Sequence, residues 1–189
     1  RTLDSDGRKQ YWAIYQSLFQ GNPYGKQTVI GTVDHLKNPS ITEIKKYFNS
    51  YYRPNNVAIC MSGELDFDKT IRLIDKHFGD WEPNLEIPKI DLKKLSESTS
   101  PIFKEVIGPD KESVWLGFRF DGKAKDDLLK VDLIDMLLSN RAAVLIDLNL
   151  VQKQKVLSAL ATVIELNDFS SHNFRANPKE GQSLEDLKD

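Results

Sequence analysis

Cysteine and histidine are scarce in this sequence, and their scarcity limits the chemistry that the chain offers. A single cysteine, Cys60, excludes a disulfide within the chain and lies in an apolar run, where a thiol behaves as a small hydrophobic side chain. The three histidines, His35, His77 and His172, are too far apart in the sequence to present two imidazoles at i,i+3 or i,i+4 on one helix. The residues alone therefore predict no bound metal or other cofactor and no catalytic cysteine.

An excess of one charge and a long hydrophobic run are also missing. The 189 residues include 26 basic and 28 acidic side chains, so the chain lacks the basic field that binds a nucleic-acid backbone. The longest apolar runs, at 57–61 and 142–146, have about five residues, whereas a membrane span needs about 20. Neither a nucleic-acid partner nor a membrane span is expected. Gly-rich phosphate loops and the G-x-S-x-G motif of serine hydrolases do not occur in the sequence either.

Hydrophobic residues make up 40% of the chain, and their spacing predicts amphipathic helices at 8–20, 40–53, 66–79 and 124–138, with a further helix at 142–151. Ser40 and Glu43 match a capping box, and Asp66 is a favourable N-cap. The aromatic residues of the second helix are interpreted as core: Tyr47, Phe48, Tyr51 and Tyr52. The wide apolar arc of the 124–138 segment predicts a well-buried helix. Its aspartates are interpreted as its solvated side and N-terminal charge: Asp126, Asp127, Asp132 and Asp135.

Short or alternating apolar runs predict the strands of a sheet. Strands are expected at 57–61, 102–107, 113–120, 156–166 and 169–176, and Asn167-Asp168 reads as the turn of a hairpin between the last two. Residues 29–36 are expected to form a loop with a possible short strand. Because helices interleave with strands and one hairpin is antiparallel, the sequence predicts an α+β fold with mixed, largely antiparallel sheets covered by helices.

The composition changes near the middle of the chain. Residues 81–101 contain Pro83, Pro88, Pro101 and a serine-rich run at 96–100, with little hydrophobic periodicity. Such a segment is typical of a linker, so we expect two structural parts, 1–80 and 102–189, joined by 81–101. Both ends of the chain look interrupted, and we interpret the sequence as a fragment of a longer protein.

The first half of the chain contains short motifs in a specific order. An N-P-Y-G turn at 22–25 is followed by G-T at 31–32, Y-Y-R-P-N-N at 51–56, G-E-L-D at 63–66 and F-G at 78–79. This series resembles the pitrilysin/insulinase family of zinc metallopeptidases, which includes the mitochondrial processing peptidase. Residues 102–189 look like the start of the next repeat. The motif positions, which we interpret as structural, are Asn22, Pro23, Tyr24, Gly25, Gly31, Tyr52, Pro54, Asn56, Gly63 and Asp66.

The resemblance implies homologous α+β domains that enclose a chamber around zinc. Residues 1–80 would be the C-terminal part of one peptidase-like domain, and 102–189 the N-terminal part of the next. In this family, zinc is held by an inverted His-x-x-Glu-His motif and a later glutamate, and the motif's glutamate activates the zinc-bound water. The chain contains no such motif. No catalytic or metal-binding residue is therefore carried over to this fragment, and zinc is expected only in the intact parent protein.

The functional prediction is a non-catalytic segment of a zinc metallopeptidase that hydrolyses peptides inside an enclosed chamber. Its partners would be the peptide substrate and either the rest of the same polypeptide or a homologous subunit, and a periplasmic or secreted parent is favoured. Two alternatives remain open: part of a non-catalytic homologue acting as a partner or structural subunit, and an unrelated α+β binding module. The turn at 22–25 either shapes the chamber wall or, as we favour, only ends one helix and redirects the chain.

Overall fold

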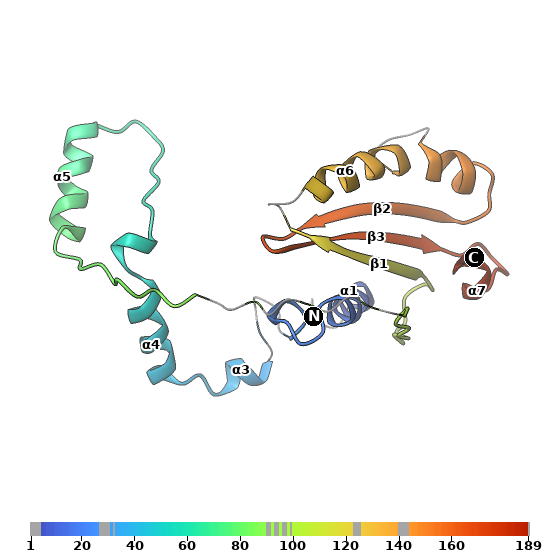
Figure 1. The fold of residues 1–189 in the computed structure, drawn as a ribbon, viewed down its shortest axis with the longest axis horizontal. Coiled ribbons are helices and arrows are strands. Elements are labelled where there is room, and N and C mark those ends of the chain that lie inside the picture. Colours follow the sequence, from blue (N-terminus) through green and yellow to red (C-terminus); the bar gives the residue numbers. More distant parts are fainter. Residues whose placement is uncertain are drawn as a thin grey trace. The chain divides into compact units, whose positions relative to one another are not determined.

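The chain forms two compact units. The computed structural model describes residues 5–26, 31, 33–89, 92, 95, 98, 100–122, 126–139 and 144–188. The first unit consists of Arg1–Gln27 together with Lys94–Asp189, and the second of Thr28–Lys93. The described strands belong to the first unit, and helices occur in both (Figure 1). This combination of helices with an antiparallel sheet confirms the α+β class.

The first unit is built on a three-stranded antiparallel sheet with the strand order β1-β3-β2. β1 spans Val114–Asp121, β2 Ser158–Glu165 and β3 Phe169–Asn177. The central strand β3 pairs with both neighbours, so that His172 is opposite Phe118 in β1 and Val163 in β2. The strands predicted at 113–120, 156–166 and 169–176 are confirmed, as is the hairpin between the last two.

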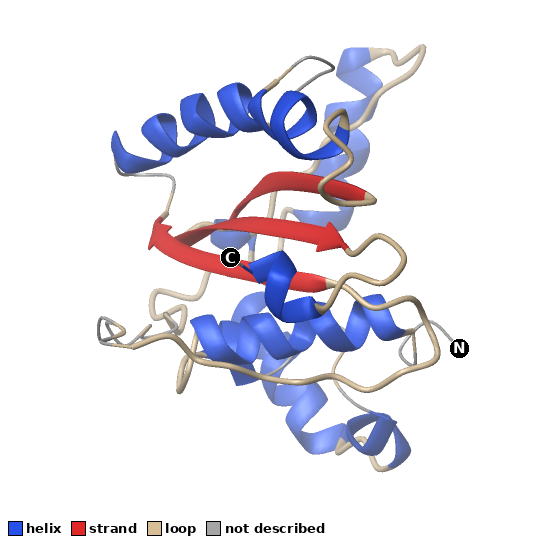
Figure 2. Ribbon diagram, turned by 90° about the vertical axis from the view of Figure 1, so that its right-hand side faces the viewer, coloured by secondary structure: helices blue, strands red, loops and turns tan. Residues whose placement is uncertain are grey.

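Helices α1 and α6 cover opposite faces of this sheet (Figures 1 and 2). α1 (Asp6–Leu18) lies against the face of Gly117, where Ile14 and Leu18 fill the space above the glycine. α6 (Asp126–Leu138) lies against the opposite face, which carries His172. Alternate residues of a strand point to opposite faces, so the core is divided between two layers. The buried apolar side chains among the described residues are Tyr15, Phe19, Leu128, Val131, Val156 and Ala161.

Three short helical segments also belong to the first unit. They are α2 (Pro23–Lys26), a π-helical turn at Asp147–Val151, and α7 (Leu184–Lys188). The helix predicted at 142–151 is therefore only partly correct: its described end is a π-helical turn, and residues 142 and 143 lie outside the described part of the chain.

The second unit contains α3 (Val33–Lys37), α4 (Ile41–Tyr51) and α5 (Phe67–Phe78). Both predicted caps are present. The Ser40 hydroxyl accepts a hydrogen bond from the Glu43 N–H at 3.3 Å, and the Asp66 carboxylate accepts one from the Lys69 N–H at 3.0 Å. These local interactions start α4 and α5 at the positions that the sequence predicts.

Two predicted strands are wrong, and both failed for the same reason. Residues 57–61 and 102–107 are irregular, and most of their apolar side chains are solvent-exposed, including Ile59 at 48% and Phe103 at 75%. A strand forms only where a neighbouring strand accepts and donates its backbone hydrogen bonds. Among the described residues no partner strand lies beside either segment, so the apolar pattern alone did not produce a strand.

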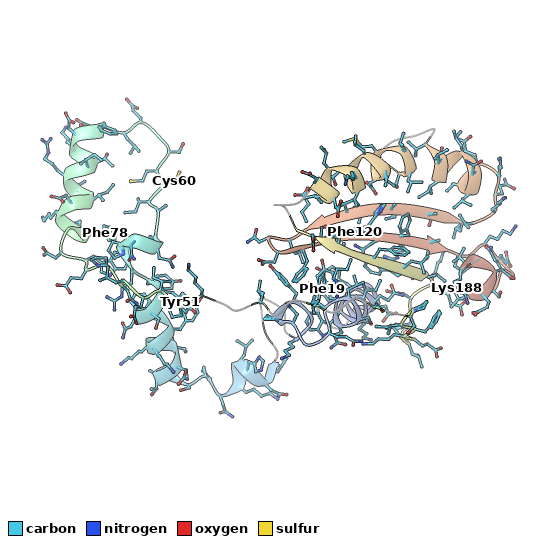
Figure 3. All side chains as sticks on the ribbon, viewed as in Figure 1. Phe19, Tyr51, Cys60, Phe78, Phe120 and Lys188 are labelled. Atoms are coloured by element: carbon cyan, nitrogen blue, oxygen red, sulfur yellow. The ribbon has the colours of Figure 1, made fainter. Side chains whose placement is uncertain are left out.

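Several burial and local-structure predictions are also wrong. Residues 33–37 form α3, where a loop or strand was expected. The aromatic residues of α4 pair with one another, with ring centroids 4.6 Å apart for Tyr47 and Tyr51, but Tyr47 remains 60% exposed. Cys60, expected inside a buried strand, is exposed (Figure 3).

The prediction that the 124–138 helix is well buried is also wrong, because in α6 only Leu128 and Val131 are buried. The outward side chains of α6 are apolar and roughly half to two-thirds exposed: Leu129, Leu133, Ile134, Met136 and Leu137.

The boundaries of the observed units differ from those of the predicted parts, and the predicted linker at 81–101 is divided between the units. Residues 1–27 pack with 94–189, whereas the sequence grouped 1–80 together. Part of the predicted linker, including residues 90 and 91, lies outside the described residues. The assignment of 1–80 and 102–189 to two homologous domains stays a prediction. No helix in the described part of the chain has the length and hydrophobicity needed to cross a membrane.

Replacing Gly122 by alanine tests the packing at the end of the sheet. A Cβ at this position would lie 2.5 Å from the backbone of Asn167 and Asp168, so backbone atoms of the hairpin would have to move. We expect Gly122→Ala to lower the free energy of unfolding by about 2–4 kcal/mol, measured by urea denaturation. Gly7→Ala in α1 is the matched control, because nothing lies within 4 Å of its Cβ position. The control is expected to be neutral or slightly stabilising, and equal losses in both variants would contradict this interpretation.

Candidate functional site

Aromatic side chains connect α1 to the N-P-Y-G turn and to the β2–β3 hairpin. Along α1, the rings of Tyr11 and Tyr15 stack with centroids 4.2 Å apart, and Tyr15 contacts Phe19 at 5.3 Å. Phe19 is completely buried and lies 5.8 Å from the Tyr24 ring and 5.5 Å from the Phe169 ring. The spacing of 11, 15 and 19 places these rings on one face of the helix, which is the face that the sheet covers.

The turn at residues 22–25 is held by its own polar groups. The Asn22 side chain is fully buried, and its oxygen accepts a hydrogen bond from the Tyr24 N–H at 3.1 Å. The Gly25 N–H donates to the Asn22 carbonyl at 3.0 Å. A Cβ on Gly25 would lie 2.3 Å from the Phe19 carbonyl oxygen, so the chain passes too close for any larger residue. Asn22 and Gly25 therefore shape the turn itself.

Tyr24 instead uses its side chain to contact a distant part of the chain. Its hydroxyl donates a hydrogen bond to the Asp168 carboxylate at 2.8 Å. Its ring meets the Phe169 ring edge to face, with centroids 5.8 Å apart and an interplanar angle of 87°. Partial burial and the hydrogen bond to Asp168 raise the pKa of the Tyr24 phenol above its usual value. The phenol therefore stays neutral and acts as a donor.

The remaining motif positions lie in the second unit, apart from this turn in the chain. Gly31 and Gly63 have φ values of +77° and +146°, which favour glycine, whereas Thr32 lies outside the described residues. Pro54 begins a 3₁₀ turn after Tyr52, the residue that follows α4. The Asn56 side chain donates to the Tyr51 carbonyl at 2.9 Å, and Asp66 caps α5. Each of these contacts is local and orders the backbone.

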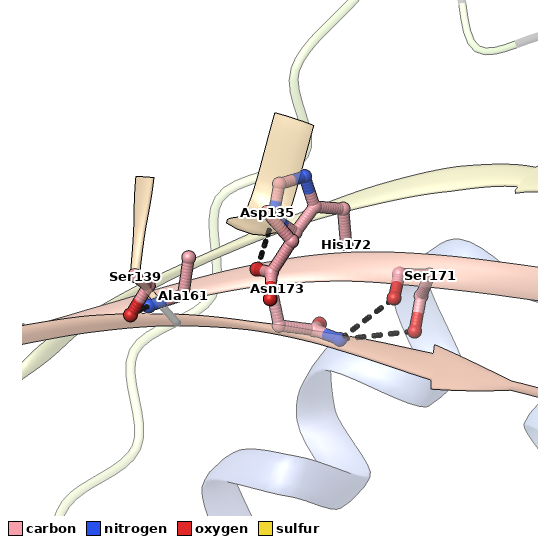
Figure 4. A network of polar contacts seen from close by, with 6 residues as sticks. All are labelled: Asp135, Ser139, Ala161, Ser171, His172 and Asn173. Carbon is pink, nitrogen blue, oxygen red and sulfur yellow. Dashed lines mark hydrogen bonds and ion pairs between the residues drawn. The ribbon is translucent and has the colours of Figure 1, made fainter. Parts of the chain in front are cut away.

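A polar pair that sequence reasoning missed lies between α6 and the sheet (Figure 4). His172 is only 4% exposed, and its Nε2 lies 2.9 Å from Asp135 Oδ1. Nearby, the Ser139 hydroxyl accepts a hydrogen bond from the Ala161 N–H at 2.9 Å. The sequence interpretation of Asp135 as a solvated residue is wrong. Asp135 lies seven and four residues after the buried Leu128 and Val131, and this helical spacing was the available signal.

The described residues do not assemble a catalytic zinc site. A catalytic zinc needs three protein ligands, and no group of three histidine, cysteine, aspartate or glutamate side chains in the described part of the chain is placed to hold a metal. His172 and Asp135 face each other and supply two such groups at most. His35 and His77 lie in the second unit and are exposed. The donor set of the described residues therefore does not fit a catalytic zinc ion.

Comparison with known proteins relates most of the chain to one peptidase family. Residues 40–188 match the family model described as Peptidase M16 inactive domain. Zinc protease PqqE of Helicobacter pylori is 27% identical over 195 residues, covering 100% of this chain and 43% of that protein. A probable mitochondrial-processing peptidase subunit beta of Schizosaccharomyces pombe is 25% identical over 73 residues, covering 39% of this chain and 16% of that protein. The chain thus spans less than half the length of these curated relatives.

Solved structures share the fold at lower identity. The crystal structure of a protease from Helicobacter pylori has a TM-score of 0.74 at 23% identity, covering 100% of this chain and 46% of that one. The first half of the periplasmic protease PqqL from Escherichia coli has a TM-score of 0.65 at 13% identity, with coverage of 100% and 46%. Both comparisons support the α+β fold described above.

A double-mutant cycle tests the polar pair. Asp135→Leu leaves the buried His172 imidazole without its partner, and His172→Phe leaves a part-buried carboxylate. Each single change is expected to lower the free energy of unfolding by about 1–3 kcal/mol, whereas the double variant recovers most of the loss, because an apolar pair replaces both polar groups. Asp127→Leu, which removes an exposed ion pair with Lys130 in the first turn of α6, is the control and should lower stability by about 1 kcal/mol or less, with no coupling to His172. If urea denaturation gave a loss of unfolding free energy in the double variant equal to the sum of the two single losses, His172 and Asp135 would not be coupled.

The buried Tyr15 phenol predicts loss of stability in alkali. Burial, reinforced by the neighbouring Tyr11, raises the pKa of Tyr15 far above its usual value. The folded chain therefore holds this proton more tightly than the unfolded chain, whose tyrosines titrate near pH 10. The contribution of Tyr15 is present in full below about pH 10 and is lost as the pH rises above it. Urea denaturation at about pH 8 and about pH 11 should show a smaller pH dependence for Tyr15→Phe than for the unmodified chain.

Proposed function

This chain belongs to the peptidase M16 family, also called the pitrilysin/insulinase family, and on this basis we propose that it is a non-catalytic segment of a zinc-dependent metallopeptidase. The observation that carries the proposal is the match of residues 40–188 to a domain that the family description calls inactive. In the intact protein, peptides would be hydrolysed inside an enclosed chamber, at a zinc ion held by residues outside this chain. The family match removes the alternative of an unrelated α+β binding module.

The second unit supports a role inside a larger assembly. None of its described residues in 33–89 is buried, although α4 and α5 have apolar faces. Ile41 is 68% exposed and Ile44 56% on α4, and Phe67 is 77% exposed on α5. Large apolar surfaces of this kind are typical of interfaces. We propose that the rest of the same polypeptide, or a homologous subunit, covers them.

The proposed domain assignment follows the order of the motifs. Residues 1–80 would be the C-terminal part of one peptidase-like domain, residues 81–101 a linker, and residues 102–189 the N-terminal part of the next domain. A periplasmic or secreted location agrees with this proposal, because the Escherichia coli structural relative is described as a periplasmic protease.

A second candidate is a non-catalytic homologue that serves as a partner or structural subunit. It is favoured by the relative from Schizosaccharomyces pombe, which is named as a subunit of a processing peptidase. The two candidates differ in whether the intact protein carries the zinc-binding His-x-x-Glu-His motif upstream of the N-P-Y-G turn.

Zinc analysis and peptidase assays distinguish the candidates. The purified 189-residue chain is expected to be metal-free after dialysis and inactive on peptides, because its sequence has no His-x-x-Glu-His motif and its described residues include no three suitably placed ligands. The full-length protein should bind zinc stoichiometrically, cleave a fluorogenic peptide and lose activity with a chelator. A zinc-free, inactive full-length protein would support the partner-subunit candidate. Stoichiometric zinc in the 189-residue chain, lost on substituting His35 or His77, would contradict both.

A further inference from the structure

Three segments that are distant in the sequence meet at one end of the sheet. They are the turn at 22–25, the end of β1 at Asp121 and Gly122, and the tip of the β2–β3 hairpin at 166–169. The Gly122 N–H donates to the Asp168 carbonyl at 3.1 Å, and the Leu166 N–H donates to the Phe169 carbonyl at 2.9 Å. Asp168 thus presents its backbone to β1 and its side chain to Tyr24.

A turn that only redirected the chain would not need the Tyr24 side chain. Asn22 and Gly25 account for the turn geometry, because they provide the buried amide and the close approach to Phe19. The Tyr24 hydroxyl and ring make their contacts with residues 168 and 169, which are 144 and 145 positions further along the chain. The one hydrogen bond that the hydroxyl can donate is already given to the Asp168 carboxylate.

We propose that the N-P-Y-G turn, as part of the proposed domain 1–80, fastens the β2–β3 hairpin of the proposed domain 102–189, with Tyr24 as the positioning residue. The inference rests on the proposed function, because it takes residues 1–80 as part of the preceding domain. Residues 1–27 pack in the same compact unit as 94–189, so the turn and the hairpin belong to one packed unit. Tyr24 supplies a hydroxyl for the Asp168 carboxylate and a ring for Phe169, and Phe19 completes the aromatic contact from α1.

Amide hydrogen exchange at the hairpin tests the fastening. In Tyr24→Phe the ring remains and the hydroxyl is lost, so exchange of the Gly122 and Leu166 amides should accelerate about threefold to tenfold. The Leu157 amide, which donates to the Asn177 carbonyl at the opposite end of β2 and β3, reports on general destabilisation and should not change. Asp168→Ala should have the same effect as Tyr24→Phe, and Asp168→Asn, which keeps an acceptor oxygen, should have a smaller one.

The double variant and a control complete the test. Tyr24→Phe combined with Asp168→Ala should exchange no faster than either single variant, because both remove the same hydrogen bond. Tyr52→Phe, which removes the hydroxyl of a half-exposed tyrosine on the second unit, should leave all three amides unchanged. The proposal would be overturned if the double variant accelerated exchange by the product of the two single effects. It would also be overturned if the Leu157 amide exchanged as much faster as the Gly122 and Leu166 amides.

Hydrogen exchange in the full-length protein tests whether the contact between Tyr24 and Asp168 also joins the two proposed domains there. Tyr24→Phe should accelerate the same two amides there, and a response confined to the 189-residue chain would overturn the fastening role. None of these measurements depends on zinc or on peptide cleavage. A failed peptidase assay therefore counts against the proposed function alone, and an unresponsive hairpin counts against the fastening alone.

Discussion

The pairing of β3 on both sides is the constraint on which the first unit depends. β3 supplies hydrogen bonds to β1 and β2 at once, so its backbone is satisfied inside the structure. Its side chains are unusually polar for a central strand, with Ser170, Ser171, His172 and Asn173 all buried. Buried polar groups are stable where partners are available. Ser170 donates to the Asp121 carbonyl, His172 pairs with Asp135, and the Asn173 side chain donates to the Ser171 hydroxyl.

These polar contacts also fix which parts of the chain face which side of the sheet. His172 points to α6, whereas Asn173 points to Gly117 and α1, because successive residues of a strand alternate. A shift of β3 by one residue would turn each of its side chains to the opposite face of the sheet and would separate His172 from Asp135. The register of β3 therefore determines where α1 packs on the sheet. Phe19 and the turn that contains Tyr24 follow α1 directly in the chain, so their positions depend on the same register.

The described residues of the second unit include no comparable central element. Its helices begin at good caps and have apolar faces, but the described residues offer no sheet for these faces to cover. The apolar segment at 57–61 has the composition of a buried strand and is exposed. This contrast agrees with a family in which the curated relatives are more than twice as long as this chain. The family resemblance, read from motifs between residues 22 and 79, is confirmed by the family match, whereas the burial predictions for this unit are wrong.

The sequence by itself determined the features that depend on neighbouring residues. Helical spacing and the Ser40 and Asp66 caps placed α4 and α5, and alternation with a turn placed the β2–β3 hairpin, because these signals act within a few residues. The tertiary structure alone decided which apolar runs found a strand partner, that Asp135 faces His172, and that Tyr24 reaches Asp168. These contacts join residues 37 and 144 positions apart, and no local pattern encodes them. Local sequence preference selects a helix or an extended segment. Strand pairing and burial depend on contacts with residues that are distant in the sequence.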